Sequence, residues 1–266
     1  MTSARQRRIA SGIFTIFLTI FFIISFTFLT SCRSDSDSAG QAVEGNNDGE
    51  KESLYLFDYE KIKIEKTGSI DVVIKNCYLY LDIYQDLIIL GEVENVSEVN
   101  KTDIEITIDF YGKSGDIITL ARIPATVNYL RGGSRLPFCY YLTEREKYID
   151  IFRVKIGINY KDYYEKFKGN PIVENESYYY EEDFLIIEGK VINLGEREIR
   201  NLKLFCTFFN NKNQVVFVKQ CYLSREEMNY AQEQEFVLKV LLDEYLPEFT
   251  HYRFEVFFED EIEVPV

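Results

Sequence analysis

Leu87-Ile-Ile-Leu-Gly-Glu-Val-Glu-Asn95 returns 98 residues later in the chain as Leu185-Ile-Ile-Glu-Gly-Lys-Val-Ile-Asn193. The register continues without a gap, and near the end of each copy Arg153–Ile156 matches Arg253–Val256 after a shift of two residues. A repeat held over this length indicates that one structural unit occurs twice. The same spacing relates four alternate apolar positions in each copy, which are Ile104, Ile106, Ile108 and Phe110 against Leu202, Leu204, Cys206 and Phe208.

Each copy carries the pattern of short β-strands joined by turns. Asp103–Phe110 alternates polar with apolar residues, so its apolar side chains share one buried face. Gly112–Gly115 predicts a hairpin turn, and Asn210–Asn213 is its counterpart. Asn95 and Asn193 are suited to ending their strands in Asx turns. Together with 20 Tyr and 21 Phe, these signals predict an all-β protein of two tandem immunoglobulin-like β-sandwich domains.

The repeated motifs resemble those of the FxLYD-type domains of bacterial envelope proteins. That family has a Gly-x-Val-x-Asn strand, a strand ending near Phe/Leu-Tyr-Asp, a turn containing Gly, and a later Phe. The sequence departs from the pattern where Gly112 and Asn210 replace the Asp, and the second copy lacks the turn Gly. The resemblance implies a β-sandwich fold and frequent attachment to lipoproteins, and it transfers no catalytic residue. The matching positions are Gly91, Val93, Asn95, Phe110, Tyr111, Gly115 and Phe138, then Gly189, Val191, Asn193, Phe208, Phe209 and Phe236.

The amino terminus has the layout of an export signal. Arg5, Arg7 and Arg8 precede an uncharged stretch, Ile9–Leu29, that is long enough to span a bilayer. Length alone leaves open a cleaved signal or a permanent anchor. Leu29-Thr-Ser-Cys32 resembles the lipobox of bacterial lipoproteins, in which the cysteine becomes the lipid-bearing first residue. Residues 1–31 are therefore predicted to be a lipoprotein signal peptide, and Cys32 the lipidation site.

Residues 32–53 are expected to be a flexible tether. The segment holds one sizeable apolar residue, so it cannot bury enough surface to offset the entropy of ordering it. The two sandwich domains are then expected at 54–168 and 169–266. Two or more acyl chains hold a protein stably at a membrane. The sequence thus predicts a protein held by lipid on the extracytoplasmic face of a cell membrane, periplasmic or extracellular.

Charge and residue content argue against several functions. The formal net charge is −14, and about −17 once the signal is removed, which argues against nucleic acid as a partner. His251 is the only histidine, and no zinc, Cys-x-x-Cys or phosphate-binding motif occurs. We expect no metal, no cofactor and no enzymatic activity.

Four cysteines besides Cys32 are divided evenly between the modules. Cys77 and Cys139 belong to the first, and Cys206 and Cys221 to the second. An exported protein can keep disulfides, yet the two pairs do not occupy matching repeat positions. Cys206 replaces a core isoleucine, and a buried thiol behaves as a small hydrophobic group. We favour free thiols over a disulfide within either module.

Aromatic and arginine residues suggest candidate interaction surfaces. Phe205 and Phe209 take outward positions on the main strand of the second copy, and Tyr178–Tyr180 lie just before its first strand. Such residues mark a binding face, or they cover the junction between the modules or the flank of a sandwich. Residues 122–135 form a candidate loop in which three arginines meet an acidic partner or are solvated turn residues. Those arginines are Arg122, Arg131 and Arg135.

The sequence therefore favours a membrane-anchored, non-catalytic binding or scaffolding module for an envelope protein or polymer. A second class is an envelope hydrolase or a solute-binding lipoprotein with a site between the two domains. A deep cleft there would favour it, and a closed apolar junction would weaken it. A stalk without specific recognition is a third possibility.

Overall fold

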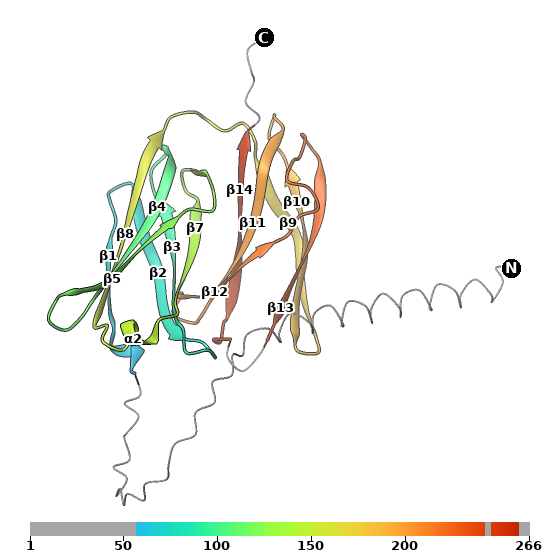
Figure 1. Ribbon diagram of the computed structural model, residues 1–266. Helices are drawn as coiled ribbons and strands as arrows, with labels where there is room; N and C mark the ends of the chain where they lie inside the picture. The colour runs from blue at the N-terminus through green and yellow to red at the C-terminus, as the bar shows by residue number, and fades with distance from the viewer. Residues whose placement is uncertain (1–56, 243–245, 261–266) are drawn as a thin grey trace, which may run out of the picture. The chain divides into compact units, whose positions relative to one another are not determined.

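The computed structural model describes residues 57–242 and 246–260, all within one compact unit. The predicted signal peptide, Cys32 and the predicted tether lie outside the described residues. Among the residues described, no helix is long and apolar enough to cross a membrane. The described chain is built of two tandem β-sandwich modules (Figure 1), which confirms the predicted all-β sandwich fold.

The first module packs a three-stranded sheet against a five-stranded sheet. The first sheet has the order β2-β3-β7, and the second has β1-β8-β4-β5 with β6 paired to β4. Two short helical segments accompany them, η1 (Tyr59–Lys61) and α2 (Arg145–Tyr148). The strands are β1 (Lys63–Thr67), β2 (Val72–Leu81), β3 (Leu87–Asn95), β4 (Asn100–Tyr111), β5 (Ile117–Pro124), β6 (Tyr129–Leu130), β7 (Arg135–Leu142) and β8 (Arg153–Tyr163).

The second module repeats this plan with six strands in two sheets, ordered β9-β10-β13 and β12-β11-β14. Its first strand begins at Pro171, eight residues after the last strand of the first module ends at Tyr163. The expected boundary at 168/169 falls in this connecting segment. The strands are β9 (Pro171–Glu181), β10 (Phe184–Asn193), β11 (Ile199–Phe209), β12 (Val215–Cys221), β13 (Glu233–Leu241) and β14 (His251–Asp260).

The spacing of 98 residues holds to the end of the second copy. Phe110 pairs with Val154 across β4 and β8, and Phe208 pairs with Tyr252 across β11 and β14. Val154 therefore corresponds to Tyr252, and the shift of two that we expected near the ends is wrong. The local likeness of the two Arg-containing segments produced that shift, whereas backbone pairing fixes the register.

Both predicted hairpin turns are present and have the same geometry. The Gly112 amide donates to the Asp116 carbonyl, and the Asn210 amide donates to the Gln214 carbonyl. Gly115 and Asn213, at matching positions, both have positive φ, 89° and 57°. Glycine adopts this conformation freely and Asn tolerates it, so the missing turn Gly of the second copy leaves the turn intact.

The Gly-x-Val-x-Asn motif is explained by close packing and by a buried amide. A Cβ on Gly91 would lie 2.7 Å from the Phe138 ring, and one on Gly189 would lie 2.8 Å from the Phe236 ring. The fully buried Asn95 side chain donates to the Val99 and Leu130 carbonyls at 2.8 and 3.0 Å. It also accepts the Ser97 amide, as the predicted Asx turn requires. Asn193 makes the corresponding bonds to Arg197, Met228 and Gly195.

Two strands of the first module, β1 and β6, have no counterpart among the described strands of the second, where an isolated bridge between Ile199 and Met228 takes the place of β6. The strand β1 runs parallel to β8, with Lys63 opposite Arg153 and Thr67 opposite Gly157. Ile64 of β1 is partly buried in the core of the first module, and Ile62, directly before the strand, is buried there. In the second module, β14 is the counterpart of β8 and is the edge strand of its sheet.

Candidate functional site

Phe205 and Phe209 lie at the junction of the two modules and are not a free binding surface. Only 7% of Phe205 and 2% of Phe209 is exposed. Phe205 packs edge-on against Phe257, with 5.8 Å between ring centroids, and both rings join the hydrophobic core cluster of the first module. The expectation that these side chains form an exposed face is wrong, and the alternative that they cover the junction is confirmed. Outward residues of one sandwich become interior residues when a second sandwich packs on them.

A second apolar cluster at the junction joins the outer face of the β2-β3-β7 sheet to β11 and β12. Its buried members come from both modules. Burial of several large apolar side chains stabilises such a contact by roughly 1.5–3 kcal/mol each. The modules are therefore held in one fixed arrangement. The cluster consists of Tyr80, Ile88 and Leu90 of the first module and Phe209 and Val215 of the second.

An ion pair crosses the same junction. Glu92 of β3 is fully buried and pairs with Arg253 of β14. The other Glu92 oxygen accepts the Asn76 amide at 2.8 Å. The Arg253 guanidinium lies 5.0 Å from the Phe209 ring centroid and also donates to Glu255 at 2.9 Å. Burial raises the pKa of Glu255 above its usual value, against the opposing effect of Arg253.

The three candidate arginines are separated and each has a partner within the fold. Arg122 lies on β5 and pairs with Asp109 at 3.2 Å, while Arg135 begins β7 and pairs with Glu94 at 3.3 Å. Arg131 stacks over the Phe258 ring of the second module, 4.4 Å from its centroid, and burial lowers its pKa. The segment 122–135 is not a single loop, since β5 ends in it, β6 lies within it and β7 begins at its last residue. The structure thus does not gather these residues into one basic patch.

The tyrosine run lies within β9, not before it. Tyr178 and Tyr180 contact each other edge-on, and Tyr178 meets Tyr252 of β14 with 6.3 Å between ring centroids. The Tyr179 hydroxyl donates to Glu188 at 3.0 Å. All three tyrosines remain exposed. Tyr178 therefore lies across the flank of the second sandwich, between its two sheets.

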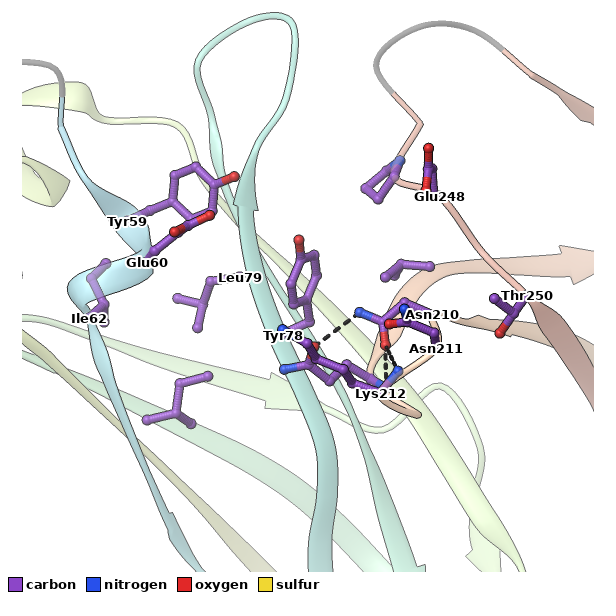
Figure 2. A pocket seen from close by; sticks show the side chains of 14 residues that line it. Tyr59, Glu60, Ile62, Tyr78, Leu79, Asn210, Asn211, Lys212, Glu248 and Thr250 are labelled. Carbon is purple, nitrogen blue, oxygen red and sulfur yellow. Dashed lines mark hydrogen bonds between the residues drawn. The ribbon is translucent and has the colours of Figure 1, made fainter.

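A pocket of about 690 Å³ opens at the junction and is the candidate functional site. Figure 2 shows that side chains of η1 and β2 form one side, and that the β11–β12 turn and residues before β14 form the other. The turn is held by the Asn210 carboxamide oxygen, which accepts the amides of Lys212 and Gln214. The Gln214 side chain donates in turn to the Cys77 carbonyl of β2 at 3.5 Å.

The pocket lining is rich in polar groups that are available to a ligand. Within the described part of the chain, the side chains of Glu60, Asn211, Lys212 and Glu248 have no hydrogen-bond or ion-pair partner. Tyr78 contributes a phenol whose pKa is raised mainly by burial. Carboxylates, amides and an ammonium beside tyrosine rings suit a ligand with many hydrogen-bonding groups. The remaining lining residues are Tyr59, Ile62, Ile64, Leu79, Asn210, Gln214, Val216, Pro247 and Thr250.

The described cysteines and the single histidine are held within the packing of the fold. All four described cysteines are free thiols. Burial raises the pKa of Cys77 to about 12, of Cys139 to about 11 and of Cys221 to about 12, so each is protonated at neutral pH. The His251 ring stacks on Phe209, 5.0 Å between centroids. Within the ranges 57–242 and 246–260, no group of three metal-ligating side chains is found.

Sequence reasoning missed the Glu92–Arg253 pair and the junction pocket. Glu92 fills a variable position of the Gly-x-Val-x-Asn strand, where outward polar residues are usual. A comparison of the two copies could have revealed one other buried charge, because Lys101 stands where the second copy has the apolar Ile199. Lys101 is indeed fully buried and bonded to Asp71 and Asp162, at 3.1 and 2.6 Å.

Comparison with known proteins gives neither a family nor a curated relative, since no family model and no curated protein sequence matches the chain. Among solved structures, it is similar to red sea bream transglutaminase, at 9% identity and a TM-score of 0.21, over 70% of this chain and 29% of that one. It is also similar to a calcium-binding mutant of Bacteroides uniformis beta-glucuronidase 2, at 12% identity and a TM-score of 0.21, over 70% of this chain and 26% of that one. For the tandem CBM22 domains of Paenibacillus barcinonensis Xyn10C, the identity is 10% and the TM-score 0.14, over 73% of this chain and 85% of that one. The chain thus spans under a third of the first two.

Proposed function

We propose that this protein is a lipoprotein, anchored through Cys32 on the extracytoplasmic face of a cell membrane, that binds an envelope protein or polymer without catalysing a reaction. The lipobox-like Leu29–Cys32 and the duplicated FxLYD-like motifs support the proposed location. The raised pKa values of Cys77 and Cys221 and the stacking of His251 on Phe209 support a non-catalytic role.

The main support for the binding role is the packed interface between the two modules. Apolar clusters and the Glu92–Arg253 pair hold two sandwiches in one arrangement, and the tyrosine- and amide-lined pocket is formed by both of them. A pre-organised surface spends little of its binding free energy on ordering itself. A stalk without specific recognition would not require the modules to share a pocket of this kind.

The test is crosslinking of the lipidated protein in cells, followed by pull-down and mass spectrometry, with Cys32→Ala as the control. We expect one dominant envelope partner that is lost when the anchor is removed. An Asn211→Trp variant fills the pocket from an exposed turn and tests whether the pocket takes part. Failure to enrich any partner would contradict a protein-binding role.

A solute-binding role is the second candidate, and the volume of the pocket is the observation that favours it. About 690 Å³ lies within the range of small-molecule sites. Thermal unfolding of the full chain in the presence of short oligosaccharides and amino acids tests this candidate. A ligand should raise the midpoint of the wild-type chain and leave Asn211→Trp unchanged. Equal shifts in both proteins would place binding outside the pocket.

A further inference from the structure

The second module has an open sheet edge where the first module carries a strand. In the first module, β1 pairs with Arg153–Gly157 of β8. The corresponding residues, 98 positions later, are His251–Glu255 of β14. Within the described ranges no strand pairs with β14 on that side. An unpaired edge presents backbone donors and acceptors that can template another strand.

Hydrogen bonds show that the two edges have the same backbone geometry. The Phe152 amide donates to the Tyr111 carbonyl at 2.9 Å, and the Thr250 amide donates to the Phe209 carbonyl at 2.7 Å. In the first module the Phe152 carbonyl then accepts the first amide of β1, from Lys63, at 3.1 Å. The Thr250 carbonyl has no such donor among the described backbone groups.

The far end of this edge is closed, which gives the open part a definite length. The Arg131 side chain donates to the Val256 carbonyl at 3.4 Å, and the guanidinium covers Phe258. Asp260 accepts the Gly169 amide of the connecting segment at 2.8 Å. The edge left open is therefore His251–Glu255, which matches the five-residue length of β1.

Burial supports the same conclusion independently. Val154 and Ile156, on the strand that β1 covers, are fully buried. Their counterparts Tyr252 and Phe254 are partly exposed. Tyr178 reaches Tyr252 across the flank but remains largely exposed. Core-facing side chains of the second module are thus incompletely covered where the added strand would lie.

We propose that the second module binds an extended segment of a partner protein as a strand parallel to β14 along His251–Glu255. The inference rests on the proposed binding function and names its partner class. Ile62, directly before β1, and Ile64 within it show the pattern required, in which apolar residues two positions apart face the core. The partner segment is basic, because Glu176 lies exposed near Tyr252 and the chain carries a net charge of −14.

The probe is a fluorescent peptide with the sequence of residues 61–68, which is basic and carries the β1 pattern. It is titrated against the purified, lipidated full-length protein in detergent by fluorescence anisotropy. Hydrogen exchange with mass spectrometry locates the binding. We expect saturable binding and slower exchange within residues 251–256. The protein without peptide should sediment as a monomer, since the occupant proposed is a partner segment and not a second copy.

Backbone methylation of the peptide separates strand addition from other binding without altering the protein. Because Lys63 donates to β8, the amide of Glu65, two residues on, also faces β8, while the amide of Lys66 faces away. A methyl group on the peptide nitrogen equivalent to Glu65 should weaken binding by roughly tenfold or more. The same change at the position of Lys66 should alter it less than about twofold.

Three results would overturn the inference. They are equal effects of the two methyl groups, protection that maps to the pocket turn at Asn210–Gln214, and self-association of the free protein through this edge. If the peptide does not bind but a partner is captured in cells, the proposed role of the β14 edge is wrong and the binding function still stands. Absence of any captured partner would contradict the protein-binding role on which the inference rests.

Discussion

Removal of Arg253 should leave a buried carboxylate without its cation. In Arg253→Met, the fully buried Glu92 keeps the Asn76 bond at 2.8 Å and loses its ion pair. Breaking a buried pair in this way costs roughly 3–5 kcal/mol. The Arg253 side chain is 30% exposed, so solvent already screens part of the interaction. We therefore expect a loss of about 2–4 kcal/mol in the free energy of unfolding.

The assay is urea unfolding at neutral pH, followed by circular dichroism. Arg122→Met is the matched control, because Arg122 pairs with Asp109 on the surface, is 48% exposed, and should cost less than about 1 kcal/mol. The double variant Glu92→Gln with Arg253→Met should recover much of the loss, since no buried charge remains. Equal costs for Arg253→Met and Arg122→Met, or no recovery in the double variant, would refute the reasoning.

Substitutions at Lys101, Gly91 and Phe205, and a second-site change at Phe138, are tested by the same unfolding assay. Lys101→Met should change stability by less than about 1 kcal/mol near neutral pH, because its partner carboxylates stay solvated. Because Lys101 lowers the pKa of Asp162, the pair stabilises the wild type while Asp162 is ionised, and this stabilisation is lost as the pH falls and Asp162 becomes protonated. The stability of Lys101→Met should not show this loss. Gly91→Ala should cost about 1–3 kcal/mol because its Cβ would meet the Phe138 ring, and Phe138→Leu should relieve part of that cost. Phe205→Asp should destabilise the fold by roughly 3 kcal/mol or more, and a free energy of unfolding equal to that of the wild type would contradict the burial of Phe205.

The repeat made most of the fold predictable from sequence. Backbone conformation depends on local signals that both copies carry, such as the Asx turn at Asn95 and the hairpin at Gly112–Gly115. Alternation also identified the inner face of Asp103–Phe110 correctly, since Ile104, Ile106, Ile108 and Phe110 are buried.

The site was less predictable because it arises between the copies. Strand alternation assigns a side chain to the inner or outer face of its own sandwich, and it carries no signal for a neighbouring module. Phe205 was therefore placed on the surface, although it belongs to the core cluster of the first module. Glu92 is an outward residue of its sheet that a second module buries. The difference between the copies at Lys101 and Ile199 marks a buried cation whose partners, Asp71 and Asp162, belong to the first module, so it gives no signal for the junction.

The two copies have diverged on the surfaces through which they meet. The surface through which the first copy meets the second has Leu90, where the second copy has Glu188. On the receiving side, the second copy offers Phe205 and Phe257, where the first copy has Thr107 and Asn159. A further copy would find a matching surface at neither end. Packing of another copy in the same arrangement would therefore require new apolar residues at the positions of Glu188, or of Thr107 and Asn159.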